Sequence, residues 1–264
     1  MAASTDPPAL PVEGVLWVTT SIMNKALSPS VLDTWYDEHK DDVLNCPGNG
    51  GLFLRYKNID QTSDAYVDPG FGDRINNNNQ VNPDASEKSI AAVQWPYLAL
   101  VKLSDLNWLT SQQFLDMPRV SKVLPPEADG SMGSAFSCWH AGLRSYETIA
   151  REVANDKDSS SRPKYLLSVQ TRNADDATWA ALDSKYTTLP GFRGSVKYRN
   201  VNGLLEYQEP GALPLGLAIY EFDGEQPPSP PTTDVQGVVR LDVWKLTLEA
   251  GDLSLYPGAN FLNQ

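Results

Sequence analysis

The chain repeats one order of expected elements, and this internal repeat constrains its fold more than any other feature. Each half reads strand, helix, strand, strand, helix, strand, and each first helix ends at a Pro-Gly pair, Pro47-Gly48 or Pro190-Gly191. The expected strands are residues 14–22, 54–58, 97–105 and 134–149 in the first half, and 164–172, 196–200, 215–223 and 238–248 in the second. This order is that of the split βαβ, or ferredoxin-like, unit.

Two such units in tandem predict an α+β fold, because one unit leaves a sheet face bare and two facing sheets bury both. We expect a tail over residues 1–13, a first half over 14–154, a polar linker over 155–163 and a second half over 164–264. The first half should hold the functional pocket and the second should complete the structure.

The two halves differ in ways that predict unequal roles. The first half carries an Asn-rich insert over residues 60–89, which is either a lid or a disordered loop. It also carries an apolar pattern over 104–124 that predicts a second helix, whereas the matching segment 224–237 is too rich in proline and glycine for one. His39 matches Asp183 in the second half, so we expect one functional pocket per chain and no role for Asp183 in activity.

Composition excludes several function classes. A net charge of −12 argues against nucleic acid as a partner, because phosphate binding needs a basic patch. No apolar run is long enough to span a membrane, and the first residues lack the pattern of a signal peptide, so we expect a cytoplasmic protein. With two histidines and two separate cysteines, Cys46 and Cys138, we expect no metal site, and the absence of nucleotide-binding motifs predicts no cofactor.

His39 is the candidate acid or base. Leu32, Trp35, His39 and Val43 recur at helical spacing and form one apolar stripe, so the imidazole should point inward while the neighbouring acids face solvent. A histidine there can move a proton at neutral pH, or it can be a core residue bonded to a carbonyl.

A second cluster is expected on the closing strand. Residues of even number share one face of a strand, and that face would carry Cys138, His140, Arg144 and Tyr146. Arg144 and Tyr146 could stabilise an enolate-like oxygen, or Arg144 could form a structural ion pair. Aromatic side chains could line a flat apolar pocket or belong to the core; the candidates are Tyr56, Trp95 and Tyr97.

The segment W-Y-D-E-H-K-D, together with the closing L-R-S-Y-E-T-I, resembles the EthD-type dimeric α/β-barrel proteins of fungi. The matching residues are Trp35, His39, Arg144 and Tyr146, all in the first half. The resemblance implies ferredoxin-like units whose two sheets close a barrel, here within one chain. It also implies kinship with small cofactor-free enzymes of polyketide metabolism, namely cyclases, decarboxylases and dehydratases.

We therefore expect a cofactor-independent lyase or cyclase that acts on a small hydrophobic, polyketide-type metabolite. His39, Arg144 and Tyr146 would be catalytic, and Trp35, Tyr56, Trp95, Tyr97 and His140 would bind the substrate. The alternative is a non-catalytic binding or carrier protein for an apolar molecule; a third possibility, haem binding, needs a histidine facing an open cavity. A monomer or a homodimer would be compatible with a barrel closed within the chain.

Overall fold

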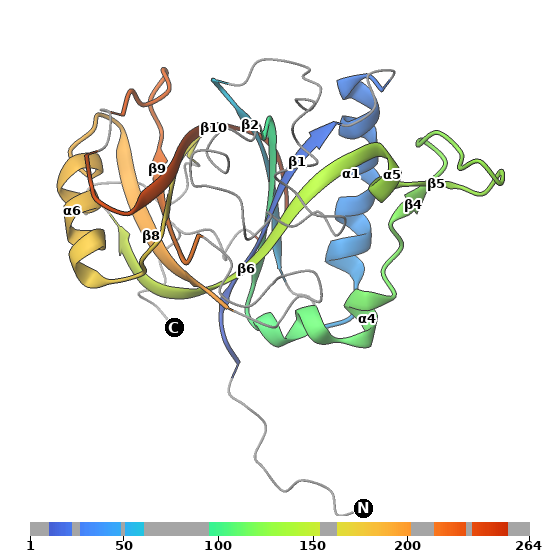
Figure 1. Cartoon of the computed structure of the whole chain (residues 1–264), viewed down its shortest axis with the longest axis horizontal. Coiled ribbons are helices and arrows are strands. Elements are labelled where there is room, and N and C mark those ends of the chain that lie inside the picture. Colours follow the sequence, from blue (N-terminus) through green and yellow to red (C-terminus); the bar gives the residue numbers. More distant parts are fainter. Residues whose placement is uncertain are drawn as a thin grey trace, which may run out of the picture.

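The computed structural model describes residues 11–22, 27–48, 51–60, 95–153, 163–201, 214–230 and 234–252. Within them, the long strands close into an antiparallel eight-stranded barrel (Figure 1). Around the barrel the strands are β1 (Gly14–Ile22), β3 (Tyr97–Leu103), β2 (Leu52–Asn58), β10 (Val238–Gly251), β7 (Tyr165–Thr171), β9 (Gly216–Phe222), β8 (Phe192–Asn200) and β6 (Trp139–Val153). The Asn-rich insert and the linker lie outside the described residues, apart from Asp60 and Pro163.

The two halves of the chain occupy two separate arcs of the barrel. The first arc runs β6-β1-β3-β2 and the second runs β10-β7-β9-β8, so both follow the order fourth, first, third, second. The arcs join at two antiparallel seams, where Tyr56 of β2 faces Leu246 of β10 and Thr148 of β6 faces Tyr198 of β8. The repeat read from the sequence thus becomes a repeat of strand order in space.

Side-chain alternation gives the barrel two kinds of core. One cluster fills the inside and draws on both halves; Trp17 of β1 meets Trp244 of β10 edge to face, with ring centroids 6.1 Å apart. The other two clusters lie on the outer faces, each under one helix. These helices, α1 (Pro29–Asn45) and α6 (Asp176–Tyr186), stand at opposite sides of the barrel (Figure 1).

The second helix predicted over 104–124 is wrong as one continuous helix. The segment forms a 3-10 turn η1 (Leu106–Thr110), one turn of α4 (Gln112–Leu115) and a short strand β4 (Val120–Ser121), which pairs with β5 (Gly133–Ser134). Ser111 ends the first turn and caps the second, and Pro118 stops further helix. The expected loss of the matching helix is confirmed for residues 224–230, where the structure has none.

Two further expectations need correction. The expected strand over 134–149 is interrupted near its start: Ser134 ends the short strand β5 and caps a helical turn, α5 (Ala135–Cys138), and β6 begins at Trp139. Cys138 therefore does not share a strand face with Arg144. Ser28 does stand before Pro29 at the start of α1, but its hydroxyl pairs with that of Ser30 and caps no N–H group.

Candidate functional site

Helix α1 brings His39 to the outer face of the first arc. Its buried residues, Leu32, Trp35, Tyr36 and Val43, pack against strands β1, β2 and β3 as the helical spacing predicted. His39 lies one turn after Trp35 on this stripe, and its side chain is only 15% exposed. The inward orientation expected from the sequence is therefore present.

Two neighbours on the same helix fix the imidazole of His39. The ring stacks on the indole of Trp35, with centroids 4.4 Å apart and an interplanar angle of 20°. Its Nδ1 lies 3.5 Å from Oδ2 of Asp42, three residues along the helix. In the described part of the chain, Nε2 makes no hydrogen bond or ion pair, so this nitrogen is available to a ligand.

Burial sets the protonation state of His39. It lowers the pKa of the imidazole from 6.5 to about 4; the carboxylate of Asp42 opposes this shift, and the positive charge of Arg119 adds to it. The ring is therefore neutral at pH 7 and its free nitrogen is a proton acceptor.

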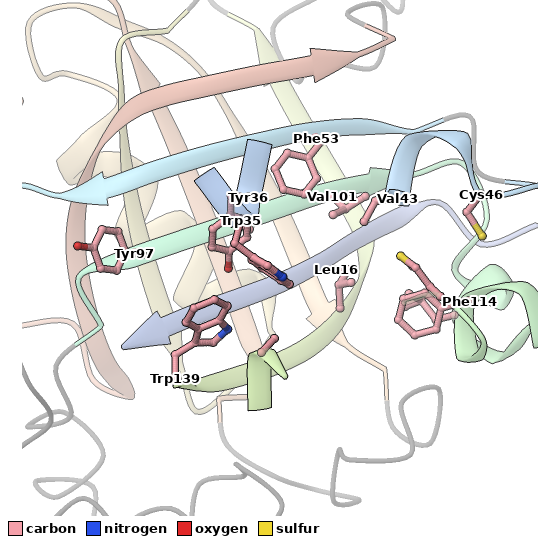
Figure 2. Close-up of a cluster of buried hydrophobic side chains, with 14 of the residues drawn as sticks. Leu16, Trp35, Tyr36, Val43, Cys46, Phe53, Tyr97, Val101, Phe114 and Trp139 are labelled. Carbon is pink, nitrogen blue, oxygen red and sulfur yellow. The ribbon is translucent and has the colours of Figure 1, made fainter. Parts of the chain in front are cut away.

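A cavity lies between α1 and the outer face of the first arc, and His39 is part of its wall. Its volume is about 90 Å³. Its aromatic lining is Trp35, Tyr36, Phe53, Trp108, Phe114, Phe136 and Trp139. Figure 2 shows the indoles of Trp35 and Trp139 next to each other, and their centroids are 4.9 Å apart. Such a lining suits a small, flat, apolar ligand.

Few polar groups line this cavity. The hydroxyls of Thr20 and Tyr36 share a hydrogen bond of 2.8 Å, and burial raises the pKa of Tyr36, so its phenol stays neutral. Arg119, from the turn after α4, supplies the cation of the wall. The site therefore combines a neutral imidazole, a buried hydroxyl pair and a guanidinium in an apolar setting.

Arg144 and Tyr146 lie on the opposite face of the sheet from His39. Tyr146 belongs to the inner cluster and is fully buried, and Arg144 pairs in register with Trp17, whose side chain also points inward. Burial raises the pKa of Tyr146 to about 12 although the charge of Arg144 opposes it. The sheet therefore separates these two residues from the cavity beneath α1.

The other predicted binding residues are also divided between the two faces of the sheet. Trp35 lines the cavity, whereas Tyr56 and Trp95 belong to the inner cluster. Tyr97 is on the outer face but outside the cavity wall; the cations of Arg55 and Lys57 lie over its ring, at 5.4 and 5.6 Å. His140 pairs in register with Ser21 of β1, and its side chain lies outside the description.

Sequence reasoning missed most of the cavity wall. Asp42 had a usable signal, since a carboxylate three residues after a histidine lies on the same side of a helix. No sequence pattern indicated the other wall residues. Trp108 comes from η1, Phe114 from α4, Arg119 from the turn after α4 and Trp139 from the start of β6. No helical or strand period connects these segments to α1.

The matching region of the second half is packed with buried side chains. Between α6 and its sheet, Tyr186 and Tyr220 are fully buried and meet at 5.3 Å. Asp183, the counterpart of His39, accepts a hydrogen bond of 2.8 Å from the hydroxyl of Tyr220 and forms an ion pair of 2.5 Å with Lys197. Its carboxylate is thus a structural link between helix and sheet.

The described residues contain no cluster of three or more His, Cys, Asp or Glu side chains able to hold a metal ion. Nor does that part of the chain contain a helix of the length and apolar character needed to cross a membrane.

One curated relative spans nearly the whole chain. Core atranone cluster (CAC) protein 1 of the fungus Stachybotrys chlorohalonatus is 24% identical, and the alignment covers 91% of this chain and 92% of that protein. No family model matches the chain.

Two solved structures align over most of the chain with low scores. A candidate monooxygenase from Lactobacillus acidophilus and a candidate chlorite dismutase each share 9% identity and a TM-score of 0.38 with it. The alignments cover 91% and 92% of this chain and 96% and 97% of those proteins. Scores this low carry no argument about function, and the strand order itself defines the fold.

Proposed function

We propose that the chain is a cofactor-independent lyase or cyclase that acts on a small hydrophobic metabolite in the cavity beneath α1. The observation that carries this proposal is the free Nε2 of His39 in an aromatic wall, with the Asp42 carboxylate at the other ring nitrogen. Cyclisation, decarboxylation and dehydration of a polyketide-type substrate all include a proton transfer at carbon or oxygen.

In the proposed chemistry, His39 accepts a proton at Nε2 from an acidic C–H or O–H bond of the substrate. The electron pair of that bond stays on the substrate as an enolate-like anion, and the imidazole becomes imidazolium. The carboxylate of Asp42, 3.5 Å from Nδ1, stabilises this cation. The imidazolium then returns the proton to another atom of the substrate, so the protein ends unchanged.

The relative supports a setting in fungal secondary metabolism, because its name places it in the core atranone cluster of a fungus. The resemblance to EthD-type proteins at Trp35 and His39 points the same way. The resemblance also includes Arg144 and Tyr146, but their position inside the barrel does not support a role for them in the cavity beneath α1.

We also infer that the barrel is a tandem pair of ferredoxin-like units that replaces the usual pairing of two chains. The equal strand order of the two arcs and the position of one helix outside each arc support this inference. A barrel closed within one chain needs no second copy, so a monomer is expected, and the cavity beneath α1 is expected to be the functional site.

Proton exchange on a model carbon acid tests the function. β-Tetralone is flat, apolar and acidic at carbon, and incubation in D₂O with NMR detection reports the transfer of its protons. We expect exchange above the buffer rate, at least about tenfold slower in His39→Gln and measurably slower in Asp42→Asn. Asp41→Asn is the matched control, since Asp41 is an exposed acid on the same helix that pairs with Lys40.

The alternative function, a carrier for an apolar molecule, predicts a different result. Quenching of tryptophan fluorescence would report saturable binding of the ketone, while exchange in the wild type would equal that in His39→Gln. The observation that favours this alternative is the low pKa of His39, which makes the imidazole a weak base.

A further inference from the structure

Arg119 is held rigidly at the cavity wall. Its guanidinium donates hydrogen bonds to the backbone carbonyls of Phe114, Leu115 and Met117, at 3.0, 3.1 and 2.5 Å. It also lies 5.2 Å from the centroid of the Phe114 ring, which lines the same cavity. These three hydrogen bonds hold the guanidinium in one orientation.

The charge of Arg119 acts on the interior of the site. It contributes to the lowered pKa of His39, and it lowers that of Cys46 against the larger effect of burial. The rest of the wall is almost wholly apolar, and Coulomb interactions are stronger in such surroundings than in water. A negatively charged group would therefore be favoured there over a neutral or a positive one.

Arg119 is placed at the mouth of the cavity. Phe136 lines the cavity and yet is 46% exposed, which marks the opening, and Arg119 is itself only half-buried. Trp35 and His39, which stack on each other, are both less exposed than Phe136, at 6% and 15%. A ligand with an acidic oxygen at one end could keep that oxygen at the mouth while its ring system enters between the aromatic side chains.

We propose that the cavity takes a flat apolar molecule that carries an acidic oxygen, as a carboxylate or an ionised enol, and that Arg119 binds this oxygen. The inference rests on the proposed function and names its substrate class. The role that the sequence suggested for Arg144 thereby passes to Arg119, which lies on the same side of the sheet as His39. Hydrogen bonds between a guanidinium and an anionic oxygen are charge-assisted and stronger than those between neutral groups.

Three naphthalene derivatives of nearly equal shape test the charge preference. Binding of 2-naphthoate, 2-naphthamide and 2-naphthylmethylammonium is followed by tryptophan fluorescence or calorimetry at pH 7. The expected result for the wild-type chain is a dissociation constant about tenfold lower for the carboxylate than for the amide, and weakest binding of the ammonium. Equal constants for the three, or no binding of the carboxylate, would overturn the proposal.

Variants locate the preference at Arg119. Arg119→Gln should bring the carboxylate and the amide to the same affinity, and Arg119→Lys should keep part of the difference. Lys122→Gln is the matched control, because Lys122 is an exposed cation three residues away that does not line the cavity. An unchanged preference in folded Arg119→Gln would contradict the assignment, and the comparison of ligands on the wild-type chain stands even if that variant fails to fold.

His39→Gln separates this proposal from the proposed function. The variant should lose proton exchange on β-tetralone and still prefer the carboxylate. A chain that shows no exchange but binds naphthoate selectively would refute the lyase or cyclase reading and leave the Arg119 site intact. A chain that exchanges protons but binds the three naphthalene derivatives equally well would refute the Arg119 site and leave the proposed function intact.

Discussion

The imidazole of His39 lies almost parallel to the indole of Trp35, with ring centroids 4.4 Å apart and an interplanar angle of 20°. The two residues are four positions apart on α1, so the helix itself sets their contact. The stack covers one face of the imidazole, and burial of the ring is the main cause of the low pKa of His39.

Replacement of Trp35 by leucine should raise the pKa of His39 from about 4 toward 6.5, because water would reach the ring. The chain has only two histidines, so ¹H–¹⁵N NMR titration can follow each, and the His140→Gln spectrum assigns them. Trp108→Leu is the control: Trp108 also lines the cavity, but its ring packs on Phe114. A value for His39 that does not move in Trp35→Leu would show that the stack does not set it.

Stability should fall as the pH falls from about 6.5 to about 4, partly because of His39. In this window the unfolded chain binds a proton at this residue and the folded chain does not, so acid favours unfolding. The loss is on the order of 2 kcal/mol. Urea unfolding at pH 7 and pH 4.5 checks it: His39→Gln should lose less stability than the wild type between these values. Equal losses of stability in the wild type and in His39→Gln would show that His39 does not cause the effect.

Asp183→Asn should lower stability and leave the first-half site working. The change weakens the ion pair with Lys197, whose side chain is only 5% exposed, and removes the charge that offsets its burial. We expect a loss of about 2 kcal/mol, less than for a fully buried pair because Asp183 is 32% exposed. Thermal unfolding measures the loss of stability, and the rate of proton exchange on β-tetralone measures the activity of the first-half site. Loss of exchange in the folded variant would contradict the assignment of activity to one half.

Lys102 and Glu221 should behave as a coupled pair inside the barrel. They lie on β3 and β9, both almost fully buried; burial lowers the pKa of Lys102 and raises that of Glu221, and each charge opposes the shift of the other. Lys102→Met alone should destabilise the fold, because it removes the cation with the larger effect on the buried acid and leaves Arg193 as the other. In Lys102→Met with Glu221→Gln, we expect recovery of about 1 to 2 kcal/mol relative to the sum of the single changes. Additive losses in urea unfolding would show no coupling.

The sequence by itself determined the repeat, the main strands and the direction of His39. These features depend on local patterns: short, largely apolar runs for β1, β3, β7 and β9, which are buried on both faces, and helical spacing along α1, whose apolar stripe must be buried wherever the helix packs. The loss of a helix at residues 224–230 was equally local, since proline cannot continue one. Composition could likewise predict an apolar site, but not the residues that line it.

Tertiary packing sets which residues share the site with His39. Arg144 and Tyr146 share one strand face, as the alternation of side chains predicted. Alternation does not tell which face of the sheet meets α1, however. Closure of the barrel placed both residues inside. Arg119 and the aromatic residues around it come from segments without a period, where η1 and α4 replace the predicted helix. Their contacts with α1 are set by packing between parts of the chain that are far apart in sequence. No local pattern records such contacts.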